Sequence, residues 1–311
     1  ESITFNGATD WVAIRTKYFI ASLVPENSNQ VASASIGGSY NDREIYDMVL
    51  SFPAASTSYS SLYLGPLEYD RIKNVGRDLD RVMNFGIWPV IHISKIVLWT
   101  LKKLHEVIPN YGYILIVFAF VVKLLVYPLT KKSYQSTAAM QRLQPEITAL
   151  KEKYKNNAKK LNEATMKLYK EKGVNPLGGC LPILLQMPLL FALFIVFRTT
   201  IELRAEPFIF WIKDLSAPDA VFTLPFSIPI YGAHVAILPI LMVVSMFIQQ
   251  RMMGGGAAQQ PQQKTMQYFM TGFFFLMFNT FPSGLNLYYT LFNVLTIAQQ
   301  KLIPPAETIT T

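Results

Sequence analysis

Charged side chains are scarce in this sequence. Asp, Glu, Lys and Arg make up 15% of its 311 residues, whereas 51% are hydrophobic, and its mean hydropathy is +0.26. Because soluble domains usually carry about 25% charged residues, the composition excludes an ordinary soluble domain of this length. It indicates that a lipid bilayer surrounds much of the chain.

Cysteine and histidine are also rare. The single cysteine, Cys180, cannot form an internal disulfide, and the three histidines are scattered without the spacing of a metal site. We therefore expect no metal, no cofactor and no catalytic residue. Cys180 is interpreted as a small packing residue, because no general base stands near it in the sequence.

The sequence does not begin with Met, and its first residues lack the charged start, apolar core and cleavage site of a secretory signal. We expect that the natural chain has been cut and that a signal anchor lies in a missing upstream part. The formal net charge is +8. Most of this surplus lies beside an apolar run, where acidic lipid or the cytoplasmic leaflet explains it as well as nucleic acid does.

Residues 1–84 differ from the rest of the chain. Stretches rich in β-branched and aromatic residues alternate there with Asn, Gly, Pro and Ser, which predicts part of a β domain. These stretches are "SITF", "WVAIRTKYFIASLV", "YDMVLSF" and "SYSSLYLG". Residues 85–110 place Lys95, Lys102 and Lys103 at helical spacing among apolar residues. They predict an amphipathic helix that lies in the membrane interface and does not span it.

Five apolar segments follow, each close to the ~20 residues that a helix needs to cross the hydrocarbon layer. They are 111–130, 177–199, 235–250, 265–281 and 283–303. We predict a mainly α, polytopic membrane protein. Its five-transmembrane-helix core occupies residues 111–303, and a tail follows at 304–311.

A polar insert at 131–175 separates the first two apolar segments. Its apolar residues recur every three or four positions on both sides of Asn156 and Asn157, which predicts two antiparallel helices and a turn. Between positions 131 and 172 it holds eleven basic and four acidic residues. The positive-inside rule therefore places this helical hairpin in the cytoplasm. By parity the acidic loop at 202–219 and the β segment lie outside.

Lys123 stands near the middle of the first apolar segment. A lysine at a helix centre costs about 2.5 to 3.5 kcal/mol on insertion scales. Snorkelling toward the headgroups is the simpler interpretation, but Lys131 is a rise of ~12 Å away, farther than a lysine stem easily reaches. We therefore favour a hydrated pocket whose sides come from the other four helices.

Polar residues of those helices are candidates to line this pocket, although each could instead form a hydrogen bond across a helix interface. They are Gln186, Gln249, Gln250, Asn279, Asn286, Tyr288, Tyr289, Asn293, Gln299 and Gln300. The five apolar runs contain no Asp or Glu, and no inverted repeat is evident. Both features count against a proton-coupled pump or secondary transporter.

The stretch "GVNPLGGCLPILLQMPLLFALF" follows the polar insert. Gly173 and the Asn175-Pro176 pair end the cytoplasmic helix, so Gly173 and Pro176 are predicted to form a hinge. The glycines and prolines beyond them predict a tight, bent path into the membrane.

Four long stretches carry a resemblance. They are "LGPLEYD", "YPLTKKSYQSTAAMQRLQPEI", "LYKEKGVNPLGGCLPILLQMPLLFALF" and "FPSGLNLYYTLFNVLTIAQQ". The chain resembles, over almost its whole length, the YidC family of bacterial membrane protein insertases, which is related to the mitochondrial oxidase assembly and chloroplast Albino-type insertases. The resemblance implies a five-helix core, a cytoplasmic coiled-coil hairpin at 131–175, and a periplasmic β-sandwich domain of which residues 1–84 are the C-terminal part.

The resemblance also implies what the chain does. Family members are not enzymes; they are insertases and chaperones that integrate proteins into the inner membrane, without ATP or a cofactor, through a hydrophilic groove with one positive side chain. Arg usually stands at that position, and Lys123 keeps the charge but loses the bidentate fork. The resemblance implies groove or substrate contacts for Gln249, Tyr289 and Asn293. It leaves groove or packing roles open for Gln186, Tyr288 and Gln300.

The implied partners are nascent membrane-protein clients, the Sec translocon and membrane lipids. The hairpin would contact the ribosome and the signal recognition particle receptor. The implied location is the bacterial inner membrane, with the β part periplasmic and the hairpin and C-terminus cytoplasmic. Two alternatives stay open: a small-anion channel or transporter that uses the same charged cavity, and a scaffold or assembly chaperone without insertion activity.

Overall fold

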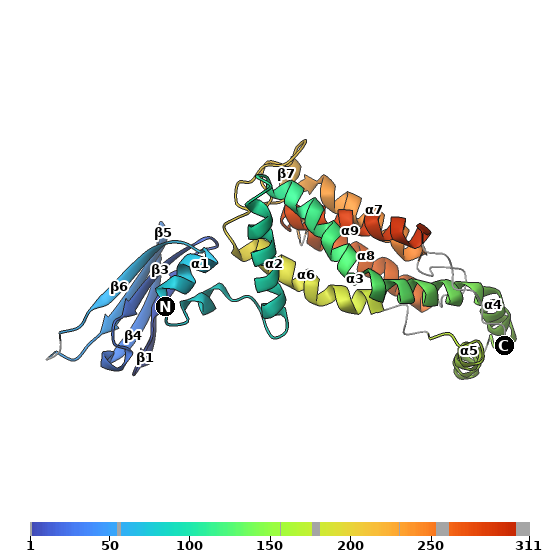
Figure 1. Cartoon of the computed structure of the whole chain (residues 1–311), viewed down its shortest axis with the longest axis horizontal. Coiled ribbons are helices and arrows are strands. Elements are labelled where there is room, and N and C mark those ends of the chain that lie inside the picture. The colour runs from blue at the N-terminus through green and yellow to red at the C-terminus, as the bar shows by residue number, and fades with distance from the viewer. Residues whose placement is uncertain are drawn as a thin grey trace.

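Two three-stranded antiparallel sheets form the first part of the chain, at one end of the molecule (Figure 1). The computed structural model describes residues 2–54, 57–155, 157–175, 181–229, 231–252 and 261–302, without the side chains of 181–183, 185, 261–264 and 267. The first sheet has the order β1-β4-β5, with bounds Ser2–Asn6, Ser33–Asn41 and Arg43–Ser51. The second has the order β2-β3-β6, with bounds Val12–Arg15, Phe19–Pro25 and Ser60–Pro66.

The sequence pattern predicted all of these strands except β4. Its sequence, "SASIGGSYN", is rich in Ser and Gly, which have little intrinsic preference for strands. Strand β4 forms nevertheless because it is the central strand of its sheet and pairs with both β1 and β5. Contacts of β2 with β4 and β5 join the two sheets.

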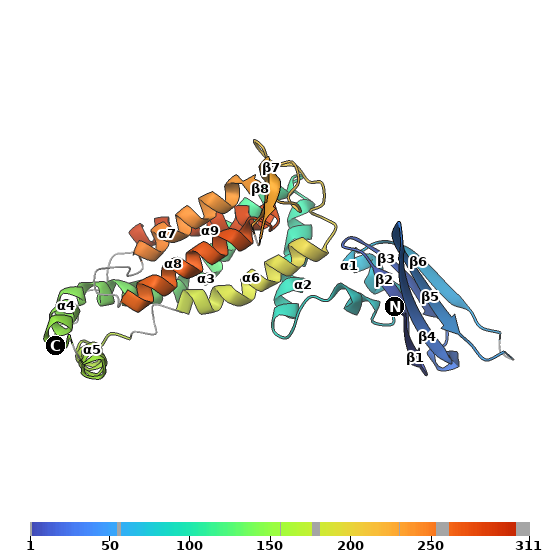
Figure 2. The same cartoon turned by 180° about the vertical axis from the view of Figure 1, so that it is seen from behind.

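Short helical segments lead from the sheets to the helical part of the chain. They are α1 (Tyr69–Val75) and the 3-10 turn η2 (Leu79–Met83), whereas the 3-10 turn η1 (Ser28–Gln30) lies between β3 and β4. The predicted amphipathic helix is present as α2 (Val90–His105), which buries Val90, Val97 and Leu101 on one stripe and packs against α3 and α6. Figures 1 and 2 show that α2 runs across the direction of the bundle helices, between the sheets and the bundle.

Each predicted apolar segment contributes a helix to the bundle. These helices are α3 (Tyr111–Arg142), α6 (Leu181–Thr199), α7 (Ile237–Met252), α8 (Pro261–Phe278) and α9 (Ser283–Leu302). Among the described helices, α3 alone is both long and apolar enough to cross a membrane by itself. Shorter apolar helical runs are Gln186–Thr199, Ile237–Met252 and Tyr268–Phe278.

Helix α3 does not end where its apolar run ends. It continues through Lys131 and Lys132 to Arg142, although the sequence indicated that the polar insert would begin its own helices at position 131. The change at 131 is a change of composition only, because no Gly or Pro follows until Pro145 and the residues there, such as Gln, Ala, Met and Arg, favour helix. Buried Ser133, Tyr134 and Thr137 also hold this part of α3 against the bundle.

The hairpin that the polar insert predicts is formed by α4 (Gln144–Lys153) and α5 (Ala158–Glu171). Leu143, Ile147 and Leu168 form a small buried cluster of their own, with Leu150, Tyr169 and Val174 packed against it. The hairpin lies at the end of the molecule opposite the β sheets (Figure 1).

A two-stranded antiparallel hairpin, which the sequence pattern did not predict, precedes α7. Its strands are β7 (Ala220–Ile228) and β8 (Gly232–Ala236), and their register is irregular. Asp219 fixes its base, because Oδ2 accepts hydrogen bonds from the backbone N–H groups of Ile237 and Leu238 at the start of α7. The hairpin and α2 lie at the same end of the bundle (Figure 2).

Candidate functional site

The side chain of Lys123 points into the helix bundle. The residue is 7% exposed, and its Nζ atom donates a hydrogen bond to Oγ1 of Thr296 at 2.6 Å and another to Oη of Tyr134 at 3.4 Å. The ammonium also lies 4.3 Å from the ring centroid of Phe292, in cation–π contact. The charge is therefore held inside the bundle and does not snorkel to the headgroups.

Helical spacing brings these groups together. Thr130 and Tyr134 follow Lys123 by seven and eleven positions, which are close to two and three turns at 3.6 residues per turn, so all three share one face of α3. On α9, Thr296 follows Asn293 by three positions and lies on the same side of that helix. Hydroxyl and aromatic groups thus converge on the ammonium from two helices.

A cavity of about 30 Å³ opens beside Lys123. A space of this size holds about one or two water molecules. Of the described residues that line it, Lys123 alone is charged. The lining residues come from α3, α6, α7 and α9: Val122, Lys123, Val126, Thr130, Tyr134, Gln186, Leu189, Gln249, Phe292 and Thr296.

A second cavity of about 290 Å³ adjoins the first and shares Gln186 and Gln249 with it. Four methionines in its wall give an adaptable apolar surface, because the Met side chain is flexible and polarisable. Its lining residues are Gln186, Met187, Leu190, Met242, Met246, Gln249, Gln250, Met270, Phe274, Phe278, Tyr289 and Asn293. The two cavities together are termed the bundle groove.

Six residues singled out from the sequence meet in the bundle groove, and one of them is Gln250, which lines the large cavity. Lys123 lines the small cavity, Tyr289 and Asn293 line the large one, and Gln249 lines both. Asn293 Nδ2 donates to Ser245 Oγ at 3.2 Å. The Tyr289 hydroxyl is buried and finds no hydrogen-bond partner among the described residues. Gln186, whose role the sequence left open between groove and packing, also lines both cavities.

Tyr288 and Gln300 lie elsewhere in the part of the chain that the structure describes. Tyr288 is fully buried and packs among the rings of Phe118, Tyr289 and Phe292. Gln300 is half-buried, and neither residue lines the cavities described above. Their positions favour the packing role over the groove role.

Three further polar candidates hold neighbouring elements together. Asn279 Nδ2 donates to the carbonyl oxygens of Tyr231 and His234 at 2.8 and 2.7 Å, which fastens the β7–β8 hairpin to the end of α8. Asn286 Nδ2 donates to the carbonyl of Phe278 at 3.0 Å. Gln299 Nε2 donates to Thr130 Oγ1 at 3.3 Å and links α9 to α3.

The sequence reading missed four residues that contact or surround the ammonium. They are Thr130, Tyr134, Phe292 and Thr296. The helical spacing of Thr130 and Tyr134 from Lys123, and of Thr296 from Asn293, was available as a signal. It was overlooked because Thr130 and Tyr134 lie at and beyond the end of the apolar run, and because Thr296 and Phe292 are ordinary residues in an apolar helix.

The predicted hinge lies at the end of α5. Gly173 has φ +63°, and the backbone N–H groups of Gly173 and Val174 donate to the carbonyls of Lys170 and Tyr169. This is the Schellman arrangement that ends many helices. Ser136 Oγ donates to the carbonyl of Asn175 at 2.8 Å and ties the chain back to α3. Pro176 and Cys180 lie outside the described residues.

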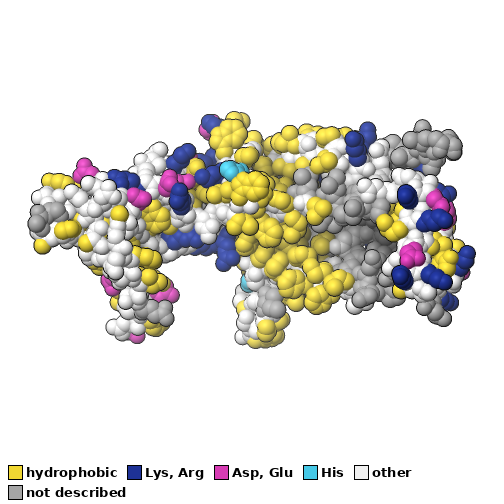
Figure 3. Space-filling model, turned by 90° about the horizontal axis from the view of Figure 1, so that it is seen from below, with side chains coloured by type: hydrophobic (Ala, Val, Ile, Leu, Met, Phe, Trp, Pro, Cys, Tyr) yellow, Lys and Arg dark blue, Asp and Glu magenta, His cyan; other side chains and the backbone are white. Residues whose placement is uncertain are grey.

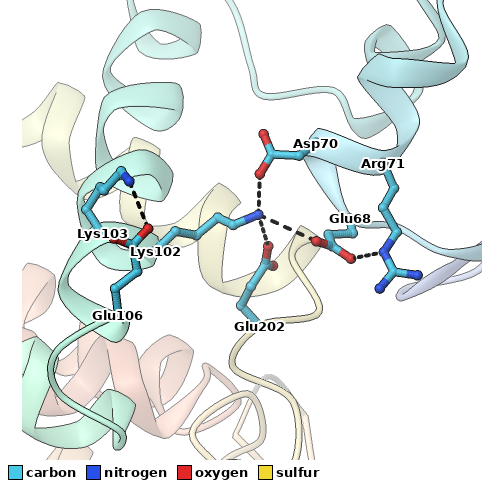
Figure 4. Close-up of polar contacts among 7 residues, drawn as sticks. All are labelled: Glu68, Asp70, Arg71, Lys102, Lys103, Glu106 and Glu202. Carbon is cyan, nitrogen blue, oxygen red and sulfur yellow. Dashed lines mark hydrogen bonds and ion pairs between the residues drawn. The ribbon is translucent and has the colours of Figure 1, made fainter.

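Lys102 of α2 joins that helix to α1 and to the loop after α6 (Figure 4). Its ammonium forms ion pairs with Asp70, with Glu68 at 3.6 Å and with Glu202 at 3.7 Å, which come from α1, its preceding turn and the loop after α6. Burial alone would lower the pKa of Lys102, but the three carboxylates outweigh it and raise that pKa. Burial raises the pKa of Glu202, and Lys102 offsets this only in part. No pattern in the sequence predicts that this lysine is paired.

Two protein-family models match the chain. The model described as 60Kd inner membrane protein matches residues 103–308, and the model described as YidC periplasmic domain matches residues 2–100. Together they cover the helical bundle and the β sheets.

Curated relatives named membrane protein insertase YidC are similar along the chain. The protein from Chlorobium luteolum is 44% identical over 308 residues, which are 96% of this chain and 52% of the relative. The protein from Pelodictyon phaeoclathratiforme is 43% identical over 313 residues, 97% of this chain and 53% of the relative. The chain thus spans about half the length of the curated relatives it matches.

A solved structure, described as an active YidC insertase crystal structure with the first transmembrane domain resolved, has a similar fold. It matches with a TM-score of 0.53 and 23% identity, over 96% of this chain and 78% of that chain. An identity this low supports the fold alone. With the family models covering both parts of the sequence, the chain belongs to the family of the 60Kd inner membrane protein and carries its YidC-type periplasmic domain.

Proposed function

We propose that this chain is the working part of a membrane protein insertase and chaperone, which integrates proteins into the bacterial inner membrane through the bundle groove. The names of its curated relatives support the activity. The observation that carries the proposal for this chain is the buried Lys123 ammonium, whose neighbours are hydroxyl groups and an aromatic ring.

The position of the charge suits the task of moving a short polar segment into the membrane. Coulomb attraction between unit charges about 4 Å apart grows from about 1 kcal/mol in water to about 4 kcal/mol at an effective dielectric constant of 20. Lys123 therefore attracts acidic residues of a client segment more strongly in the groove than an exposed lysine would. Polar Gln186, Gln249 and Asn293 offer the same segment hydrogen bonds.

The larger cavity suits the apolar part of a client. Its wall combines methionines with Phe274 and Phe278 beside the polar groups, so a client helix can place apolar side chains there before it moves into lipid. Burial of apolar surface drives that last step, and it requires no covalent chemistry.

Five helices, α3 and α6 to α9, are proposed to cross the membrane. Large apolar residues face outward on each of the first three, including Leu124 and Leu125 on α3, Phe191 on α6 and Val244 on α7. Figure 3 shows hydrophobic side chains over the middle of the molecule, with charged side chains gathered on either side of them. A belt of this kind fits lipid in the middle and water at each end.

We propose that the β sheets and α2 face the periplasm and that the hairpin α4–α5 faces the cytoplasm. The match to a periplasmic domain model supports the first part, and the eleven basic against four acidic residues of positions 131–172 support the second. The basic hairpin is the proposed contact for the ribosome and the signal recognition particle receptor. Cooperation with the Sec translocon is proposed from the family alone.

The experiment that tests this function uses the purified chain in proteoliposomes with a single-span client. Insertion, measured by protease protection of the translocated segment, is expected above the level of empty liposomes. Lys123→Arg serves as the matched control that keeps the charge. Flux of a small anion without client insertion would support the channel alternative instead, and client protection from aggregation without insertion would support a scaffold.

A further inference from the structure

The hairpin β7–β8 exposes apolar side chains on both of its faces. Val221, Phe222, Phe226 and Ile228 on β7 are all exposed, and Phe226 is 62% exposed. Residues 220–236 contain no Asp, Glu, Lys or Arg. An isolated two-stranded hairpin is marginally stable in water, and an apolar patch this dense on a soluble surface marks an interaction site.

The base of the hairpin is fixed firmly to the bundle. Asp219 accepts hydrogen bonds from Ile237 and Leu238 at the start of α7, and also from Trp211 Nε1 at 3.0 Å. Asn279 holds the other strand through the carbonyl of His234 and the backbone N–H of Ala236. The hairpin is therefore a fixed part of the outer end of the bundle and not a loose loop.

The apolar surface of the hairpin continues directly into that of α7. Strand β8 ends at Ala236 and α7 begins at Ile237, and α7 exposes Ile240, Leu241 and Val244. Whatever covers the outward face of α7 therefore extends to the hairpin. At the same end of the bundle, α2 and the turn before it expose Trp88 and Trp99 (Figure 1), the residue type enriched at the membrane–water interface.

The strands themselves limit how deep the hairpin can lie. A two-stranded sheet leaves the outer backbone groups of both strands without strand partners, and β7 and β8 are paired irregularly in addition. Open sheet edges do not occur in the hydrocarbon core, where no water satisfies them. In the headgroup region, by contrast, water and polar lipid groups can bond to the backbone while the aromatic side chains reach the acyl chains.

We propose that β7–β8 is a lipid-binding hairpin, which inserts Phe222 and Phe226 into the outer leaflet at the boundary between headgroups and acyl chains. It anchors the outer end of α7 at a fixed depth. The uncharged composition of the hairpin fits zwitterionic as well as anionic lipid, so binding does not depend on the charge of the headgroup. The inference rests on the proposed span of α7, but it does not require that the protein inserts clients.

The test places one fluorescent probe on the hairpin. In a Cys180→Ser background, Phe226→Cys is labelled with an environment-sensitive dye, and the full chain is reconstituted in phosphatidylcholine vesicles. Tyr40→Cys, on the 80% exposed Tyr40 of the β sheet, is the matched control, and Val244→Cys on α7 marks the membrane interior. Lipids with nitroxides at the headgroup or deep in the acyl chain act as depth markers, and aqueous iodide reports access from water.

We expect the probe at Phe226 to be quenched severalfold more by headgroup nitroxide than the probe at Tyr40, and severalfold less by iodide. The deep nitroxide should quench Val244 more than Phe226. A probe at Phe226 that iodide quenches as readily as at Tyr40 would overturn the proposal. Protection from iodide without quenching by either lipid would also overturn it, because a protein surface and not lipid would then cover the hairpin. Client insertion by the labelled protein is measured separately, so its loss would not be mistaken for failure of lipid binding.

Discussion

The Nζ atom of Lys123 lies 2.6 Å from the Oγ1 atom of Thr296 and so connects α3 to α9 inside the bundle. The same Thr296 hydroxyl donates to the carbonyl of Phe292 one turn earlier, at 2.7 Å. The hydroxyl oxygen thus accepts a hydrogen bond from the ammonium while the hydroxyl proton is donated to the Phe292 carbonyl, and the two bonds fix the orientation of the hydroxyl. The contact places the charge at the wall of the bundle groove.

Thr296→Val should destabilise the protein. It should also weaken insertion, but less than removal of the Lys123 charge does. The substitution keeps the shape but leaves the ammonium without its nearest acceptor, and an unsatisfied buried polar group costs about 1–3 kcal/mol. Thr290→Val is the matched control, because Thr290 makes the same bond to the carbonyl four residues earlier, at 2.8 Å, and does not touch Lys123. Thermal unfolding in detergent measures the difference, and equal losses for the two variants would contradict the role of this contact.

Lys123→Ala should impair clients selectively. Clients with acidic residues in the translocated segment lose an attraction, and a loss of about 1.4 kcal/mol would reduce their insertion about tenfold. Clients with neutral segments should lose less, because the polar groups of the groove remain. Lys123→Arg should retain insertion, since the charge is kept, and Lys123→Glu should be worst for the acidic clients. The measurement is protease protection of paired clients that differ only in those acids; equal activity of wild type and Lys123→Ala on every pair would exclude a functional charge.

Glu202 should make stability fall as pH rises from its ordinary pKa of 4.5 toward neutrality. Burial raises the pKa of this carboxyl in the folded state, so the folded state holds the proton more tightly than the unfolded state does. The stabilisation that protonated Glu202 provides is present below the unfolded pKa and is lost as pH rises through the folded one. Lys102 pairs with this carboxyl at 3.7 Å and also with Glu68 and Asp70, so the Lys102 charge limits the loss.

The test of the Glu202 prediction compares the Tm of wild type and Glu202→Gln across this pH range. The amide keeps the shape and cannot titrate, so the difference in Tm, wild type minus variant, should decrease as pH rises. Asp70→Asn, at a more exposed carboxylate of the same cluster, is the control and should change the pH profile less. A difference in Tm that is constant with pH would show that Glu202 does not titrate with folding.

The helices of the bundle could be predicted from the sequence because each is a long apolar run, and long runs are the strongest signal that a sequence carries. The β strands could be predicted where β-branched and aromatic residues gather. Strand β4 was not predicted because pairing with β1 and β5, and not local preference, decides it. The β7–β8 hairpin was not predicted although Val221, Phe222 and Phe226 favour a strand locally. The position where α3 ends was not predicted, because the composition changes at position 131 whereas the preference for helix does not.

The groove could be predicted in part. Lys123, Gln249, Tyr289 and Asn293 stand out as polar groups in apolar runs, and the structure brings them to adjoining cavities. The direct neighbours of the ammonium depend on how α3 and α9 are rotated against each other, which no single-helix pattern contains. The Lys102 junction was not predictable for the same reason, since its carboxylates lie far away in sequence.

The hairpin α4–α5 should exchange its amide hydrogens faster than α9. Its apolar cluster has Leu143, Ile147 and Leu168 at its centre, whereas α9 belongs to the large core of the bundle. Local opening costs less where few apolar contacts are lost. Hydrogen exchange followed by mass spectrometry measures this, and protection of residues 144–171 equal to that of α9 would contradict the prediction.

Gly112→Ala should destabilise the start of α3. Asn110 caps this helix by accepting a hydrogen bond from the Gly112 N–H at 2.9 Å, and the ring of Phe208 packs directly on Gly112. A Cβ atom there would lie 1.9 Å from a carbon of that ring, far closer than two carbons can approach. The ring or the helix must move, and such overpacking typically costs about 1–3 kcal/mol.

Gly272→Ala on α8 is the matched control for Gly112→Ala. A Cβ atom at Gly272 meets no atom of the described residues within 4 Å, and Ala is favoured over Gly inside a helix by about 0.5–1 kcal/mol, so this variant should be as stable as wild type or slightly more so. Phe208→Leu combined with Gly112→Ala should recover part of the loss, because the smaller side chain can give way to the new methyl group. Thermal unfolding of the three variants in detergent measures these differences in stability. A Gly112→Ala protein that unfolds at the wild-type temperature would show that Phe208 does not hold the start of α3 in this way.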